Sequence, residues 1–203
     1  MTVLSFPGKK WGQSSSFVKI TETLYVANRK AWRDWLKKHY RDEKEIWLVY
    51  YRKQAGKPRI AYNDAVEEAL CFGWIDSTVK RLDAERIAQK FSPRKPKSGY
   101  SQANKERLRW LTARGKVMKD VPATMGDLSG EKFKIPSDIL KKLKANEQAW
   151  RNFKRYSGSY QRIRVAFVDS ARKRPAEFPK RLKHLIRMTE RNKQFGFGIE
   201  KYY

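Results

Sequence analysis

A chain of 203 residues, of which 13% are aromatic and 33% charged, can bury a hydrophobic core and is too aromatic to be intrinsically disordered. Its 47 Lys and Arg residues against 21 Asp and Glu residues give a net charge of +26, which favours nucleic acid, anionic lipid or acidic proteins as partners. The single cysteine excludes an internal disulfide bond, the N-terminus lacks the apolar segment of a signal peptide, and no apolar run is long enough to cross a membrane. We therefore expect a soluble cytoplasmic protein.

The first predicted elements are short strands and one helix. Residues 17–20 and 24–26 are strand candidates. Asn28 is a suitable N-cap for a helix that runs to about Tyr40, because its side chain can accept a hydrogen bond from the first free N–H groups. The apolar and aromatic run Ile46–Tyr51, which lies between charged residues, predicts a central strand.

The middle of the chain predicts a helix followed by two strands. Asn63 is a candidate N-cap for this helix, and Gly73 suits the left-handed position at which a helix ends. Trp74–Lys80 and Arg86–Phe91 then predict a pair of strands. Four large apolar residues of these elements are expected in the core: Trp35, Trp47, Leu70 and Trp74.

A loop rich in proline and basic residues follows the strand pair. In residues 91–101, Pro93 and Pro96 each remove a backbone donor, so a regular element is not expected there. Ser101 is a candidate N-cap for the next helix. From Ser137 onward, the apolar spacing predicts helices throughout.

These elements predict an α+β protein with a small, mostly antiparallel sheet and packed helices, followed by a basic C-terminal helical unit. We expect an α+β domain over residues 1–118, a linker over 119–136 and a helical unit over 137–203. Residues 141–203 carry 18 basic and 5 acidic side chains, a net charge of +13. One helix of this unit has an apolar stripe at spacings of three and four: Tyr160, Ile163, Phe167 and Ala171.

Several motifs of the chain resemble one protein family. They are Asp64–Ser77, Gln89–Arg94, the pattern of serine, tyrosine and asparagine within Ser98–Asn104, and the helical end from Ile135 to Arg181. Together they are similar to the YdeI/OmpD-associated family, also called bacteriocin-protection proteins, although Tyr100 stands where that family usually has Trp. The resemblance implies a stress-related or bacteriocin-protection role and an association with an outer-membrane porin, and it carries over no catalytic residue.

The segment Pro93–Ser101 is the strongest candidate for a binding site. Its basic side chains are held by two prolines, and the start of the following helix supplies free N–H groups for an anion. We expect Asp76 to form an ion pair with Arg86 or Arg94, beside an apolar wall made by Trp74. The candidate ligand-binding residues are Trp74, Asp76, Lys80, Arg86, Gln89, Arg94, Ser98, Tyr100, Ser101 and Asn104.

Other reactive side chains favour structural roles. Cys71 lies at the predicted C-terminal end of a helix, where the dipole opposes a thiolate, so we expect a buried cysteine. His39 and His184 match no zinc spacing with it, and neither a metal nor a cofactor is predicted. Glu67 and Glu68 point about 100° apart on a helix, which favours ion pairing over a shared catalytic task.

The composition and motifs together favour a cytoplasmic protein that binds an anionic small molecule or an acidic partner. One alternative is a nucleic-acid-binding protein that uses the basic C-terminal helices. Another is an enzyme with a site around Asp76 and Arg94, although no catalytic residue is assigned. The oligomeric state is left open.

Overall fold

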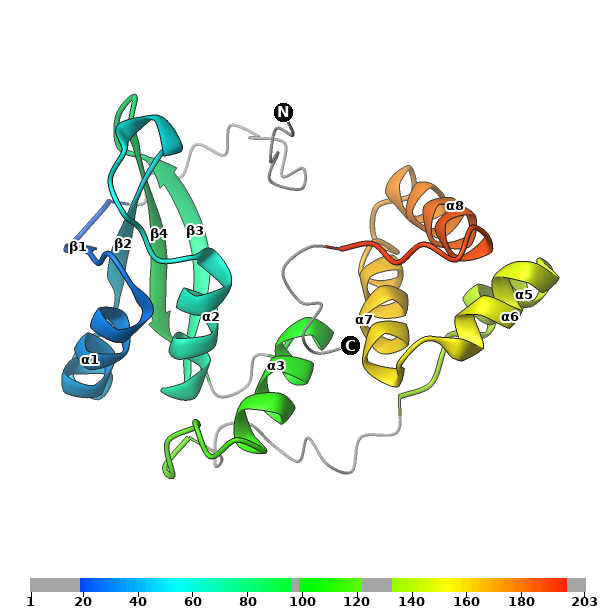
Figure 1. The fold of residues 1–203 in the computed structure, drawn as a ribbon, viewed down its shortest axis with the longest axis horizontal. Coiled ribbons are helices and arrows are strands. Elements are labelled where there is room, and N and C mark those ends of the chain that lie inside the picture. Colours follow the sequence, from blue (N-terminus) through cyan, green and yellow to red (C-terminus); the bar gives the residue numbers. More distant parts are fainter. Residues whose placement is uncertain (1–18, 96–98, 122–132, 197–203) are drawn as a thin grey trace.

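The structure is a computed structural model, which describes residues 19–95, 99–121 and 133–196. This part of the chain contains a four-stranded sheet and seven α-helices, so the α+β class is confirmed (Figure 1). The strands are β1 (Thr23–Tyr25), β2 (Ile46–Tyr51), β3 (Trp74–Arg81) and β4 (Arg86–Pro93). The helices are α1 (Arg29–His39), α2 (Tyr62–Cys71), α3 (Gln102–Thr112), α5 (Ser137–Lys144), α6 (Glu147–Arg155), α7 (Gly158–Asp169) and α8 (Glu177–Glu190), and a short 3-10 helix spans Lys53–Ala55.

The strand order of the sheet is β1-β2-β4-β3. The β1–β2 pair is parallel, and the other two pairs are antiparallel. Strand β2 lies between β1 and β4, which confirms that the run at residues 46–51 is a central strand. The strand expected at residues 17–20 is wrong for residues 19 and 20, which belong to no strand, while residues 17 and 18 lie outside the described ranges.

Helices α1 and α2 cover one face of the sheet. Alternate residues of β2 point to this face because successive side chains of a strand face opposite ways. Ile46, Leu48 and Tyr50 there join the core cluster that also contains Trp32 and Leu36 of α1. Of the four residues expected in the core, three are buried, whereas Trp35 is only partly buried and stacks between Trp32 and His39.

Of the helix ends predicted at Asn28, Gly73 and Asn63, the first two are right and the third is wrong. The side chain of Asn28 accepts a hydrogen bond from the backbone N–H of Ala31, as expected of the N-cap of α1. Gly73 has a φ of 73°, so it takes the left-handed conformation just beyond α2. Asn63, by contrast, is inside α2, which begins after Ala61 without a side-chain cap.

The β3–β4 hairpin forms the outer edge of the sheet. Its register shifts between Asp76 and Val79, which marks a bulge in the edge strand. Strand β4 continues to Pro93, so the first part of the segment expected to be irregular is extended and paired. Beyond it, the backbone N–H of Arg94 donates to the carbonyl of Gly73 at 2.9 Å, which ties the start of the loop to the end of α2.

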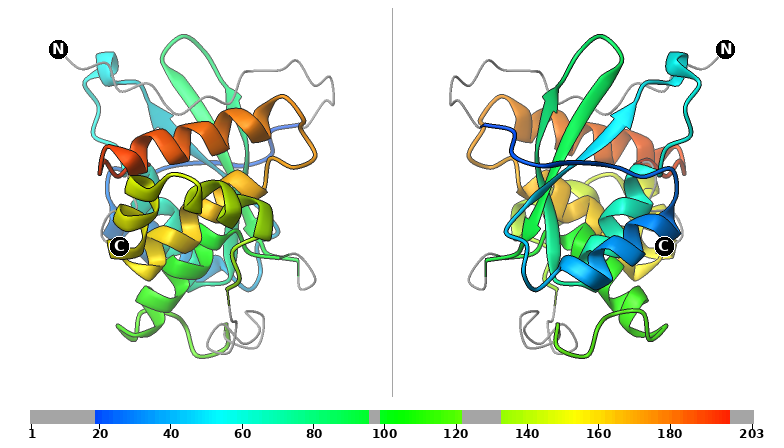
Figure 2. Two further views of the ribbon diagram at one scale, coloured as in Figure 1. Left: turned by 90° about the vertical axis from the view of Figure 1, so that its right-hand side faces the viewer. Right: turned by 90° about the vertical axis from the view of Figure 1, so that its left-hand side faces the viewer.

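The C-terminal helices form a second hydrophobic cluster of their own. Its buried members come from all four helices α5–α8: Ile139, Leu143, Phe153, Val165, Val168, Leu182 and Leu185. Helix α3 lies between the sheet and these helices and packs against α7 (Figures 1 and 2). Phe167, which belongs to the predicted apolar stripe of this unit, is 41% exposed, and most of the expected linker, residues 122–132, lies outside the described ranges. Among the helices that the structure describes, none combines the length and the apolar character needed to span a bilayer.

Candidate ligand-binding site

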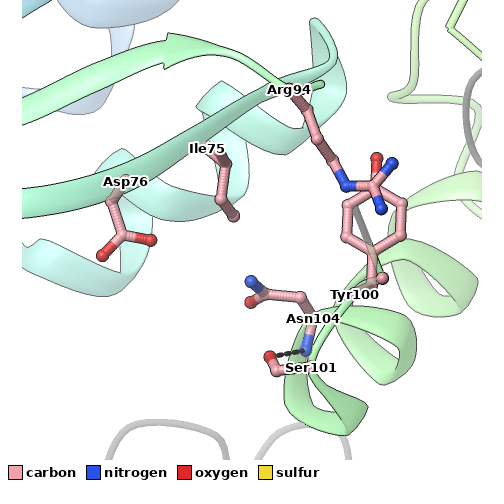
Figure 3. Close-up of a pocket in the computed structure, with 7 residues that line it drawn as sticks. Ile75, Asp76, Arg94, Tyr100, Ser101 and Asn104 are labelled. Atoms are coloured by element: carbon pink, nitrogen blue, oxygen red, sulfur yellow. Dashed lines mark hydrogen bonds between the residues drawn. The ribbon is translucent and has the colours of Figure 1, made fainter. Parts of the chain in front are cut away.

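A pocket of about 220 Å³ opens between the edge strand β3 and the start of α3. Two segments that are distant in sequence form it, the beginning of β3 and the loop that leads into α3 (Figure 3). The lining residues are Ile75, Asp76, Arg94, Gly99, Tyr100, Ser101 and Asn104. Five of the predicted site residues therefore meet in one pocket: Asp76, Arg94, Tyr100, Ser101 and Asn104.

The guanidinium of Arg94 stacks on the ring of Tyr100. Its central carbon lies 3.6 Å from the ring centroid, a close cation–π contact (Figure 3). A stacked guanidinium uses its face, whereas its N–H bonds lie in the plane, so stacking does not compete with hydrogen bonding at the edge. The contact with Tyr100 therefore restrains Arg94 at the wall of the pocket while its N–H edge keeps the geometry that suits an oxyanion.

The first turn of α3 adds further donors. Ser101 caps this helix, as expected, because its Oγ accepts a hydrogen bond from the backbone N–H of Asn104 at 3.3 Å. The Oδ1 atom of Asn104 accepts from Arg107 at 2.8 Å, and the other side of this arginine donates to Asn63 at 2.9 Å. Since Arg107 occupies the oxygen of the Asn104 amide, the NH₂ group of that amide is the end presented to the pocket (Figure 3).

Asp76 forms the opposite wall of the pocket and is held by neutral donors. Its Oδ2 atom accepts from the Tyr62 hydroxyl at 2.7 Å and from the amide of Gln89 at 3.4 Å. Burial, together with the charge of Asp76, raises the pKa of Tyr62. Tyr50 lies close to both groups, and burial is the main cause that raises the pKa of its hydroxyl as well. The hydroxyls beside Asp76 therefore stay protonated and neutral.

The expected ion pair of Asp76 is wrong. Among the described residues, its carboxylate pairs with neither Arg86 nor Arg94. Arg86 instead binds Asp83 in the hairpin turn, with 2.6 Å between Nε and Oδ2. The bulge in β3 and the local turn explain the difference, because a carboxylate three residues away is the easier partner for Arg86.

The apolar wall is also made by other residues than expected. Trp74 is 1% exposed, packs edge-on against Trp35, and donates its indole N–H to the carbonyl of Tyr40 at 3.0 Å. It therefore belongs to the core and not to the pocket, whose apolar surface comes from Ile75 and Tyr100.

The remaining predicted residues have different places. Gln89 is buried on β4 and reaches the pocket only through Asp76. Lys80 lies farther along β3 and is not part of the lining, and Ser98 lies outside the described residues. The sequence analysis missed Tyr62 and Arg107, which orient Asp76 and Asn104 from α2 and α3. Neither has a motif around it that could have revealed this contact.

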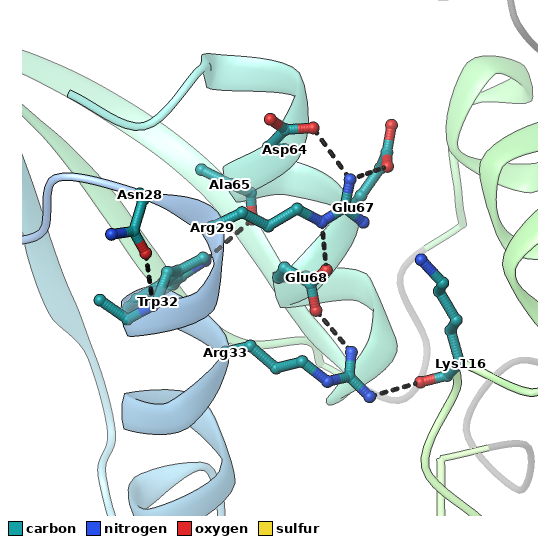
Figure 4. A network of polar contacts seen from close by, with 10 residues as sticks. Asn28, Arg29, Trp32, Arg33, Asp64, Ala65, Glu67, Glu68 and Lys116 are labelled. Atoms are coloured by element: carbon teal, nitrogen blue, oxygen red, sulfur yellow. Dashed lines mark hydrogen bonds and ion pairs between the residues drawn. The ribbon is translucent and has the colours of Figure 1, made fainter. Parts of the chain in front are cut away.

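A separate polar network joins α1 to α2 (Figure 4). The Nη1 atom of Arg29 lies 2.9 Å from a carboxylate oxygen of Asp64 and 2.9 Å from one of Glu67. The Nε atom of the same arginine binds Glu68. Glu68 also binds Arg33, whose Nη2 donates to the carbonyl of Lys116. The expected ion pairing of the two glutamates is confirmed.

Glu67 and Glu68 meet the same guanidinium although their side chains leave the helix in different directions, because a guanidinium is wide enough to contact both. Cys71, on the same helix, is fully buried, as expected. Burial raises the pKa of its thiol to about 11. This part of α2 is therefore a structural ion-pair cluster beside an unreactive thiol.

The two histidines take part in aromatic contacts away from Cys71. His39 stacks on Trp35 with 4.8 Å between ring centroids, and His184 packs edge-on against Phe195 at 4.6 Å. Within residues 19–95, 99–121 and 133–196, no three His, Cys, Asp or Glu side chains group closely enough to hold a metal ion.

Comparison with protein-family models gives two matches along the chain. Residues 24–123 match a domain of unknown function (DUF8412), and residues 132–192 match the family described as Bacteriocin-protection, YdeI or OmpD-Associated. Neither the characterised proteins nor the solved structures contain a significant match. The pocket, and the motifs of residues 64–104 that suggested the family, lie within the first match. The second match covers helices α5–α8. The similarity to the bacteriocin-protection, YdeI or OmpD-associated family is therefore supported by these C-terminal helices.

Proposed function

We propose that this protein binds a small molecule with an anionic group in the pocket between β3 and α3. The observation that carries the proposal is the position of Arg94, stacked 3.6 Å from the Tyr100 ring beside the amide of Asn104. A stacked arginine and an oriented amide present donors without a large loss of side-chain entropy on binding. Hydrogen bonds that involve a charged partner are about twice as strong as neutral ones.

The start of α3 supports the same kind of ligand. The first N–H groups of a helix have no partner within the helix and carry the positive end of its dipole. In the described part of the chain, the side chain of Ser101 accepts from one of them, the N–H of Asn104, and the others point toward the end of the helix that borders the pocket. An anion there would meet a guanidinium, an amide and backbone donors together.

The family match of the C-terminal helices suggests a role like that of bacteriocin-protection proteins. We propose that the protein is cytoplasmic, and that its N-terminal part binds the small molecule while the C-terminal helices provide the family-associated role. Helix α3 supports this proposal because it forms one side of the pocket and also packs against α7.

Calorimetric titration of the purified chain with ethyl phosphate and with propionate tests the proposal. We expect saturable binding of at least one of them, and the Arg94→Gln variant should weaken it about tenfold or more, the loss of one charge-assisted hydrogen bond. Arg86→Gln is a matched control, since it removes the same charge from the hairpin outside the pocket. Equal losses in the two variants, or no binding in the parent protein, would overturn the proposal.

A second candidate function is the binding of a polyanion such as nucleic acid by the C-terminal helices. The ring of Trp150 in α6 is near two ammonium groups, that of Lys144 at 5.5 Å and that of Lys154 at 5.7 Å from the ring centroid. The guanidinium of Arg181 lies over the exposed ring of Phe167, with 4.0 Å between its central carbon and the ring centroid. Aromatic rings among cations are typical of surfaces that stack bases and contact phosphates.

Salt dependence distinguishes this second function from the first. Binding of a fluorescent oligonucleotide should weaken steeply between about 50 and 200 mM salt if several phosphates are contacted. Trp150→Ala should weaken it further, whereas Arg94→Gln should have no effect beyond the loss of one charge. If no oligonucleotide binds even at low salt, the positive helices are only a solvated surface.

A further inference from the structure

One wall of the pocket carries an acidic side chain, Asp76, that has no cationic partner in the described part of the chain. Among the described residues, both partners of the Asp76 carboxylate are neutral, the Tyr62 hydroxyl and the Gln89 amide, and both bind its Oδ2 atom. Arg107 packs nearby between α2 and α3, but it donates to Asn63 and Asn104. Asp76 is half-buried, so its charge is only partly solvated by water.

The fully buried carboxylates of the described chain have arginine partners. Glu68 is bound by Arg29 and Arg33, and Glu106 is bound by Arg109 and Arg162. A fold with so many arginines could easily supply one for Asp76. Its partners instead fix the direction of Oδ2 and leave Oδ1 without a partner in the described structure, at the wall of a pocket.

We infer that the ligand of this pocket is a small zwitterion whose ammonium group binds Asp76 and whose oxyanion binds Arg94 and Asn104. The inference rests on the proposed function and adds the class of the ligand. Asp76 and Asn104 lie on opposite sides of the pocket, with Ile75 between Asp76 and Arg94 (Figure 3). A short aliphatic chain over Ile75 would connect the two charged ends.

A further oxygen atom lies in the interior near Asp76. The hydroxyl of Tyr50 is buried without a hydrogen-bond partner in the described part of the chain, and Tyr50 itself is 5% exposed. A hydroxyl oxygen without a partner can still accept a hydrogen bond, and a buried polar group of this kind is uncommon in a folded protein. Neither Tyr50 nor Tyr62 lines the pocket, so Asp76 is the acceptor that an ammonium group would meet there.

Two pairs of matched probes test the inference on the intact protein. Phosphoethanolamine is compared with ethyl phosphate, and β-alanine with propionate, so that each pair differs by one ammonium group. In at least one pair we expect the zwitterion to bind about tenfold more tightly or better, as a charge-assisted hydrogen bond would provide. The comparison uses the parent protein and so does not depend on the folding of any variant.

The Asp76→Asn variant then tests whether Asp76 is the group that causes the preference for the zwitterion. It should bring the affinities of the two probes in a pair close to each other and leave the binding of the simple anion unchanged or stronger. Asp83→Asn, in the hairpin turn outside the pocket, is the control for the loss of one negative charge. Thermal melting shows that each variant is folded.

The outcomes separate this inference from the proposal on which it rests. If a simple anion binds and no zwitterion binds more tightly, the inference is wrong while the proposed anion site stands. If the preference persists in Asp76→Asn, another group recognises the ammonium and the assigned role of Asp76 is wrong. If none of the four probes binds, the proposed function itself fails.

Discussion

The guanidinium of Arg162 binds the carboxylate of Glu106 through two hydrogen bonds, of 2.6 Å from Nε to Oε1 and 2.8 Å from Nη2 to Oε2. This two-point contact joins α3 to α7, and thereby connects the parts of the chain that match two different family models. Arg109, Gln102 and Ser159 also donate to the carboxylate, whose side chain is only 3% exposed. Glu106 is therefore a buried polar connection between the pocket helix and the C-terminal helices.

Replacing Glu106 by Ala should destabilise the protein by about 3 kcal/mol, because it leaves two partly buried arginines without their shared partner. Urea denaturation of the variant and the parent measures this difference. Glu85→Ala is a suitable control, since Glu85 is exposed in the hairpin turn. Equal stability of the Glu106 variant would mean that the α3–α7 contact depends on apolar packing alone.

Acid should weaken the same contact. Burial alone would raise the pKa of Glu106, but hydrogen bonds from Arg162 and Gln102 outweigh it and lower the pKa. A carboxylate with a lowered pKa stabilises the folded state fully above its unfolded pKa of about 4.3, and this contribution disappears as the pH falls through the folded pKa. The stability difference between the parent and Glu106→Gln should therefore be constant near neutral pH and shrink below about pH 4. A difference that grows in acid would contradict this assignment.

Trp47 provides a test of the sheet. It is fully buried on β2 and pairs in register with Lys90 of β4. Trp47→Ala should lower the free energy of unfolding by about 3–5 kcal/mol, the usual cost of removing a large buried aromatic side chain. Trp150→Ala, at a half-buried position on α6, should cost less in the same denaturation experiment. A melting temperature unaffected by Trp47→Ala would mean that the position adapts without leaving a cavity.

Cys71 should be slow to react with thiol reagents while the protein is folded. Its pKa is raised to about 11 by burial, so almost no thiolate is present near pH 8, and the side chain has no access to solvent. Labelling followed by mass spectrometry should show little modification in native buffer and complete modification in guanidinium chloride. Rapid native labelling would indicate that α2 opens locally.

Local sequence patterns predicted most of the elements. The helix that Asn28 caps, the central strand at Ile46–Tyr51 and the helix that Ser101 caps are all present. These features depend on residues within one or two turns of each other, and so they are readable without the fold. The prediction that Asn63 is an N-cap is wrong. Its side chain instead accepts a hydrogen bond from Arg107, a residue 44 positions away.

For the candidate site, the sequence predicts several of the residues but not their hydrogen-bond partners. Composition and the loop residues were sufficient to bring Asp76, Arg94 and Asn104 together as candidates, and the pocket contains all three. Their partners were not predictable, because the choice between Arg86 and Tyr62 for Asp76 depends on a strand bulge and on the position of α2 over the sheet.

The sequence by itself determined the α+β class, the basic charge and the segment that holds the candidate site, because periodicity, capping and net charge are properties of neighbouring residues. Only the tertiary structure decided which charges are neutralised. Glu106 meets Arg162 from 56 positions away, whereas the partners of Asp76 within the described residues are neutral donors. Ion pairs of this kind depend on how helices pack against each other, and packing is set by the whole core and not by any local pattern.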